Sequence, residues 1–188
     1  KEVRNWILMV ALVACLAACA STPMTMRSVV EPGQLRTIGN VLIVTNGDLF
    51  PDIMRQGFFD PSAAAIRRMF LDAGVKAWVI EADRKSLNPA QAAALHARQL
   101  EASHILFFST DKVVSFGPRN SPVEYSKQQR LISSYELTFV LTDLSAGRNV
   151  WKGTLQSGSD YNGDEAEARL VRDGLRAQLT KIGVMPVP

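Results

Sequence analysis

Four consecutive apolar residues, Val41–Val44, constrain the fold of this 188-residue chain more than any other segment. A continuous apolar run of this length is typical of a strand covered on both faces, as in parallel sheets flanked by helices. A second run, Ala77–Ile80, follows a segment that begins with Asp60-Pro61 and ends with Gly74. That segment carries apolar residues at helical spacing, namely Ile66, Met69, Phe70 and Ala73. With Asp60 as N-cap, the pattern predicts a strand–helix–strand unit with parallel strands.

The next segment repeats this pattern. Asn88-Pro89 combines a preferred N-cap residue with proline at the first helical position, ahead of an alanine-rich helix that ends near Ala102. His104–Phe108 then forms a third apolar run. The two repeats together predict three parallel strands joined by two helices.

The second half of the chain changes to an alternating pattern. Residues 135–142 alternate apolar and polar side chains, which is typical of a half-buried strand. Residues 143–147 favour a turn, and residues 149–157 form the returning strand of a hairpin. An apolar stripe after Asp164 predicts a last helix. The expected order is β-α-β-α-β-β-β-α: an α/β fold with a mixed (α+β) sheet of about five strands and helices packed on it, in a single domain over residues 41–188.

The N-terminus carries a separate signal. Charged residues precede an apolar run over residues 6–18, which ends in Leu16-Ala17-Ala18-Cys19. The run is shorter than the about 20 residues of a membrane-spanning helix, and its flanks are those of a secretory signal. Leu12-Val13-Ala14-Cys15 has a similar pattern, but cleavage there would leave residues 16–18 exposed. The junction at Cys19 resembles the lipobox of bacterial lipoproteins.

That resemblance implies a processed and lipidated protein. Residues 1–18 would be a signal peptide, and Cys19 would take a diacylglycerol and anchor the chain in the lipid bilayer. Residues 19–40, with Pro23, Pro32 and Gly33, show no period and are expected to be a flexible tether. In similar lipoproteins, alanine directly after the lipidated cysteine, as at position 20, suits sorting to the outer membrane. We therefore expect the chain to be anchored in that membrane with its domain in the periplasm.

Charge and motifs argue against several functions. The formal net charge of +3 gives no electrostatic reason to expect a nucleic-acid partner. The sequence contains no Gly-x-Ser-x-Gly nucleophile motif and no Gly-Lys-Ser/Thr phosphate loop. If Cys15 leaves with the signal and Cys19 is acylated, no thiol is left for catalysis. We therefore expect that the protein is not an enzyme and binds no cofactor.

A metal site is not expected either. His96 and His104 are the two histidines, and they are interpreted as an ordinary surface and an ordinary core histidine. Asp48, Asp52 and Asp60 follow the first strand but lack the spacing of a calcium loop.

Part of the second half resembles a known group of proteins. Tyr135, followed by Asp143-x-x-x-Gly147-x-x-x-Trp151-x-Gly153 before a final helix, is similar to small outer-membrane lipoproteins. These have domains like the TolB N-terminal domain, the curli secretion protein CsgG and the LpoB-type activators of penicillin-binding proteins. The resemblance implies a non-catalytic domain that binds other envelope proteins. The long insertions of a curli-type channel are absent, which argues against a secretion pore.

Two segments are candidates for contact with a partner protein. Residues 115–130 form the longest irregular stretch and carry Arg119, Lys127 and Arg130; loops of more than about 12 residues are often functional. A solvated loop is the alternative. The apolar segment 50–59 contains Phe58 and Phe59, which either pack in the core or form a partner-binding patch.

These observations predict a membrane-anchored periplasmic lipoprotein that acts as a non-catalytic binding or assembly module for another envelope protein. The alternative is an auxiliary lipoprotein of an envelope transport system of the ABC type.

Overall fold

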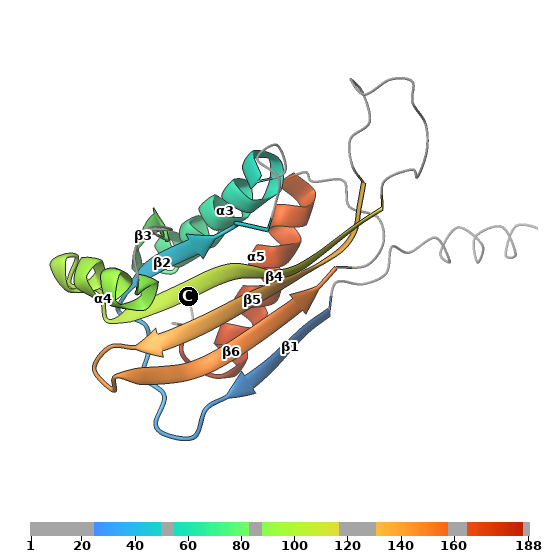
Figure 1. Ribbon diagram of the computed structural model, residues 1–188. Coiled ribbons are helices and arrows are strands. Elements are labelled where there is room, and N and C mark those ends of the chain that lie inside the picture. Colours follow the sequence, from blue (N-terminus) through green and yellow to red (C-terminus); the bar gives the residue numbers. More distant parts are fainter. Residues whose placement is uncertain (1–24, 50–54, 83–87, 117–130, 158–164, 186–188) are drawn as a thin grey trace, which may run out of the picture.

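The computed structural model describes residues 25–49, 55–82, 88–116, 131–157 and 165–185 (Figure 1). These segments form one six-stranded mixed sheet in the order β1-β6-β5-β4-β2-β3. Strand β2 is parallel to β3 and β4, and the other neighbouring pairs are antiparallel. The strands are β1 (Thr25–Val30), β2 (Asn40–Asn46), β3 (Lys76–Glu81), β4 (His104–Phe116), β5 (Leu131–Asp143) and β6 (Arg148–Gln156).

Helices cover the two faces of the sheet unequally. Helices α3 (Asp60–Asp72) and α5 (Glu165–Lys181) lie on one face, and α4 (Pro89–Gln99) lies on the other, over β2 and β4 (Figure 1). The side chains of β2 alternate between the two faces of the sheet, so helices must bury apolar residues on both faces. Val41 and Ile43 belong to the large core under α3 and α5, whereas Leu42 and Val44 belong to the smaller cluster under α4.

The expected fold class is confirmed, and the eight expected elements are present with one additional strand. Asn88 caps α4 as predicted, since its side-chain Oδ1 accepts a hydrogen bond from the Gln91 N–H at 3.1 Å. Gly74 follows α3 with a positive φ of 76°, the conformation that glycine favours after a helix. No helix in the described ranges combines the length and apolar character needed to cross a bilayer.

The expected boundary between tether and domain at residue 41 is wrong. Residues 25–30 form the additional strand β1, which pairs antiparallel with β6 along its whole length. Ile38 is buried, and its N–H donates to the Val184 carbonyl at 2.9 Å. Residues 27–30 of β1 are exposed and Met26 packs against the core, so the strand carries no apolar period that the sequence could reveal.

Candidate functional site

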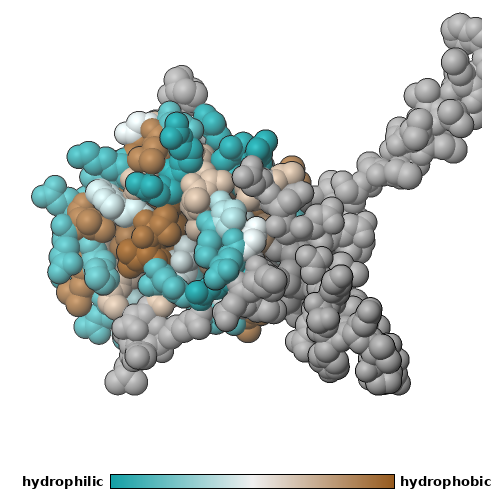
Figure 2. All heavy atoms as spheres, turned by 90° about the horizontal axis from the view of Figure 1, so that it is seen from above, coloured by the Kyte–Doolittle hydropathy of each residue, from teal (hydrophilic) through white to brown (hydrophobic). Residues whose placement is uncertain are grey.

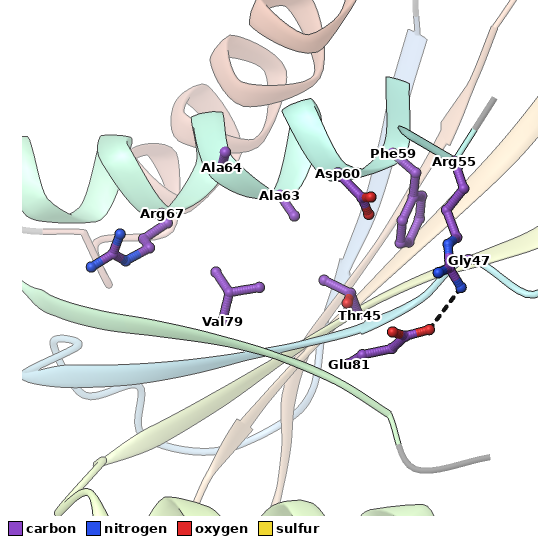
Figure 3. A pocket seen from close by; sticks show the side chains of 10 residues that line it. All are labelled: Thr45, Gly47, Arg55, Phe59, Asp60, Ala63, Ala64, Arg67, Val79 and Glu81. Atoms are coloured by element: carbon purple, nitrogen blue, oxygen red, sulfur yellow. Dashed lines mark hydrogen bonds and ion pairs between the residues drawn. The ribbon is translucent and has the colours of Figure 1, made fainter. Parts of the chain in front are cut away.

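A groove of about 370 Å³ lies between α3 and the carboxyl ends of the parallel strands β2 and β3 (Figure 3). Open α/β sheets bind ligands outside the carboxyl ends of their strands, so this is the expected place for a binding site. Helix α3, the turn before it and the two strands supply the lining, which consists of Thr45, Gly47, Arg55, Phe59, Asp60, Ala63, Ala64, Arg67, Val79 and Glu81.

Small side chains leave this groove open. Ala63 and Ala64 are the residues of α3 that line it, and Val79 faces them from β3, the edge strand of the sheet (Figure 3). Val79 is 37% exposed because two alanines cannot cover it. The molecule seen from above the view of Figure 1 shows apolar surface among hydrophilic side chains (Figure 2). The middle of the groove is therefore apolar and accessible.

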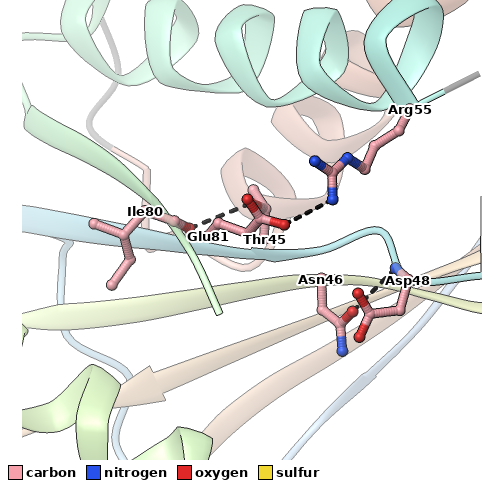
Figure 4. A network of polar contacts seen from close by, with 6 residues as sticks. All are labelled: Thr45, Asn46, Asp48, Arg55, Ile80 and Glu81. Carbon is pink, nitrogen blue, oxygen red and sulfur yellow. Dashed lines mark hydrogen bonds and ion pairs between the residues drawn. The ribbon is translucent and has the colours of Figure 1, made fainter. Parts of the chain in front are cut away.

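An ion pair closes one end of the groove. Arg55 belongs to the π-helical turn η1 (Arg55–Phe59), and its Nη1 lies 2.7 Å from Oε1 of Glu81 at the end of β3 (Figure 4). The Arg55 side chain is 25% exposed and that of Glu81 is 54% exposed, so the pair contributes little stability, about 0–1 kcal/mol. Its effect is to hold η1 against the sheet. Beside it, Thr45 Oγ1 donates to the Ile80 carbonyl at 3.2 Å.

The expectation that Asp60 caps α3 is wrong. Turn η1 runs directly into α3, so Phe59 occupies the cap position in a right-handed helical conformation and no side chain caps the helix. The Asp60 carboxylate extends from the start of α3 toward the sheet (Figure 3). It is therefore free to act as a charged group of the groove.

Arg67 lies at the other end of the groove. Its Nε donates to the Ala77 carbonyl at 3.0 Å, which fixes the guanidinium beside strand β3. Among the described residues, no carboxylate forms an ion pair with it. The groove thus has a cation at one end, an apolar middle, and a carboxylate with an ion pair at the other end, an arrangement suited to binding by charge, hydrogen bonds and apolar contact.

Phe58 and Phe59, the candidates for partner contact, are core residues. They are 0% and 1% exposed. The ring of Phe59 stacks on Phe108 at 4.3 Å between centroids, and Phe108 stacks on Phe139 at 5.0 Å. The ring of Phe58 lies 5.0 Å from that of Tyr135. The structure therefore supports the core-packing interpretation and corrects the partner-binding one, because both side chains are almost completely buried.

The remaining predicted site residues are Cys19, Arg119, Lys127 and Arg130. All four lie outside the described residues, and their roles stay predictions. The structure does place the flanks of the basic loop, since it connects β4 and β5, which have 13 residues each. Sequence reasoning did not identify Arg55, Arg67 and Glu81, because no motif links a helix face to the edge strand on which it packs.

His104 is buried, as expected for a core histidine, and is 2% exposed. It lies opposite Asp143 in the register of β4 and β5, and its Nδ1 is 2.9 Å from Ser103 Oγ. Burial lowers the pKa of His104 below its usual 6.5, although the Asp143 carboxylate opposes this effect.

Asp143 belongs to the same buried pair. Burial alone would raise its pKa, but hydrogen bonds from the Ser145 hydroxyl and from the Ala146 and Ser145 N–H groups lower it below 3.8. Asp143 fixes the turn between β5 and β6, because its Oδ1 accepts these hydrogen bonds. Within the described part of the chain, no three acidic, histidine or cysteine side chains are grouped as metal ligands.

No protein-family model and no curated protein matches the chain. Solved structures similar to it include a PelC dodecamer from Paraburkholderia phytofirmans, at 18% identity, with 81% of this chain and 94% of that chain covered and a TM-score of 0.48. A lipoprotein from Neisseria meningitidis matches at 13% identity, with coverage of 76% and 99% and a TM-score of 0.43. The LpoB C-terminal domain from Salmonella enterica matches at 18% identity, with coverage of 65% and 85% and a TM-score of 0.32. At these values the function must be argued from the residues of this chain.

Proposed function

We propose that this protein is a lipoprotein of the bacterial outer membrane that acts as a non-catalytic binding or assembly module on the periplasmic side. The observation that carries the proposal is the junction Leu16-Ala17-Ala18-Cys19 at the end of the apolar run over residues 6–18. A run of this length with small residues before a cysteine is typical of an exported and lipidated chain. Acylated Cys19 would then hold the domain in the bilayer.

Strand β1 changes where the domain would stand relative to the membrane. The strand starts at Thr25, only six positions after Cys19. Fully extended, six residues span at most about 20 Å, which is far less than the reach of a tether over residues 19–40. The domain would therefore stay close to the bilayer, and its partner would be a protein in or near the same membrane.

Labelling of the anchor tests the membrane attachment. Cys19→Ser should abolish incorporation of a metabolic acyl probe, because a hydroxyl cannot replace the thiol that takes the diacylglycerol. Cys15→Ser is the matched control and should leave labelling unchanged. Separation of inner and outer membranes should then place the labelled protein in the outer membrane. Equal labelling of the wild type and of Cys19→Ser would refute the anchor.

The basic loop is the proposed contact to an envelope protein. Arg119→Ala with Lys127→Ala should weaken capture of that protein mainly by slowing association, and the effect should shrink as salt rises. The matched control is the double variant Arg98→Ala with Lys181→Ala, which removes two positive charges from exposed positions on helices. This control should bind like the wild type. Equal capture by both double variants at low salt would remove the loop from the binding surface.

A further inference from the structure

Strand β1 forms the edge of the sheet opposite β3 (Figure 1). Within the described segments it pairs with β6 alone. The Glu31 N–H donates to the Val150 carbonyl at 3.0 Å, so Glu31 and the residues two and four positions before it direct their backbone groups toward β6. In an extended strand the residues between them direct their N–H and C=O groups the other way. Ser28 and Val30 therefore present backbone donors and acceptors at an open edge.

The side chains on one face of this edge have a regular order of charge. Ser28 Oγ donates to Gln178 Oε1 of α5 at 2.9 Å, so the side chains of Arg27, Val29 and Glu31 face away from α5. All three are exposed, and Val29 is 63% exposed. Arg27 and Glu31 are about 13 Å apart along the strand, too far to pair with each other. Neither belongs to an ion pair among the described residues.

This order of a cation, an apolar residue and an anion is complementary to itself when two copies of β1 run antiparallel. With the two Val29 side chains opposite each other, Arg27 of each copy lies opposite Glu31 of the other. The backbone groups that then meet are those of Ser28 and Val30, which point outward. A shift by two positions removes both ion pairs, and a shift by four places either two arginines or two glutamates opposite each other, which is destabilising. Charge therefore selects one register.

The position of the anchor favours a second copy of this chain as the partner strand. Thr25 follows Cys19 by six positions, so every anchored copy would hold its β1 within about 20 Å of the membrane. In the antiparallel pair the two Thr25 residues would be eight positions apart, about 26 Å along the strands. Both links can therefore reach one bilayer. Confinement to that bilayer raises the effective concentration of the two edges toward each other.

We infer that the open edge of β1 pairs antiparallel with the same edge of a second copy and joins the two sheets into one. This inference rests on the proposed function as an anchored assembly module and names a surface for it. The twofold symmetry of the pair makes every contact occur twice. A single edge strand buries less surface than the about 1,600 Å² of a stable complex, so the pair depends on the shared membrane.

Disulfide crosslinking of the full chain in isolated membranes tests this pairing. Val29→Cys places two thiols opposite each other at a Cα separation of about 4.5 Å, which a disulfide tolerates. Mild oxidation should give a dimer of twice the monomer mass. Leu95→Cys at an exposed position on α4 is the matched control and should stay monomeric, and the wild type gives the background from Cys15 and Cys19. A monomeric Val29→Cys variant, a crosslink to a different protein, or equal crosslinking of the control would overturn the pairing.

Charge exchange in the Val29→Cys background tests the register. Arg27→Glu and Glu31→Arg should each lower the crosslinked fraction by roughly fivefold or more, because two attractive cross-strand pairs become repulsive. The two substitutions together should restore the crosslink, whereas Arg98→Glu at an exposed position on α4 should not change it. Failure of the exchange to restore the crosslink would overturn the register. A dimer without acyl labelling at Cys19 would refute only the anchor, and labelling without a dimer would refute only the pairing.

Discussion

The contact between Trp151 and Gly153 provides a sharp test of packing in the main core. Trp151 is fully buried, and its indole lies over Gly153, the next residue of β6 on the same face. A Cβ placed on Gly153 would lie 2.6 Å from Cζ2 of Trp151, closer than carbon atoms approach in proteins. Glycine at position 153 is therefore required by the tryptophan, and the energies of the two positions should be coupled.

The structure gives the magnitudes of this coupling. Trp151→Ala should cost about 3–5 kcal/mol in the free energy of unfolding, because it empties a large buried volume. Gly153→Ala should cost roughly 1–3 kcal/mol, because the new methyl group displaces the indole. In the Trp151→Ala background the same methyl group enters vacated space, so its cost should fall to about zero. The expected coupling energy is therefore about 1–3 kcal/mol.

Urea denaturation followed by far-ultraviolet circular dichroism measures all four members of this cycle. Gly174→Ala is a matched control in α5, where a new Cβ would lie 3.7 Å from Leu155 Cδ1 and Met26 Cε, in ordinary contact. This substitution should stabilise the protein by about 0.5–1 kcal/mol, because alanine is the better helix former. A cost of Gly153→Ala that is equal with and without the tryptophan would refute the packing argument.

Three further perturbations test other parts of the fold. Deletion of residues 25–30 should lower the free energy of unfolding by roughly 2 kcal/mol or more, because β6 loses one of its two neighbouring strands. An unchanged thermal midpoint would show that this segment acts as a tether. Asn88→Ala should cost about 1 kcal/mol by thermal unfolding, because the Gln91 N–H loses its acceptor, whereas a neutral effect would contradict the cap. The free energy of unfolding should fall as the pH drops below 6.5, because the unfolded state then binds a proton that buried His104 resists. His104→Gln should weaken the dependence of the urea midpoint on pH, whereas His96→Gln at an exposed position should not. Equal slopes for the two variants would contradict the role given to the burial of His104.

Local signals in the sequence were sufficient for most secondary structure. The apolar run Val41–Val44 predicted a strand covered on both faces, and β2 is buried by helices on either side. Asn88-Pro89 placed the start of α4 correctly because cap and proline act within one helical turn. The alternation over residues 135–142 predicted β5, since side-chain direction in a strand depends only on position along it. The basic loop and the anchor at Cys19 remain predictions.

Tertiary contacts decided the rest. Residues 27–30 are exposed and only Met26 packs against the core, so residues 25–30 form a strand because β6 offers them an edge. The apolar segment with Phe58 and Phe59 fitted both core packing and a partner-binding patch, and the burial of both side chains in the packed structure decided for the core.

The groove is the clearest case of a feature beyond the reach of sequence reasoning. It exists because two alanines of α3 lie opposite Val79 on an edge strand. The sequence by itself determined where most strands and helices lie, because those depend on neighbouring residues. Which faces are covered, which edge is open and which charges meet depends on residues far apart in the chain, and only the packed structure brings them together.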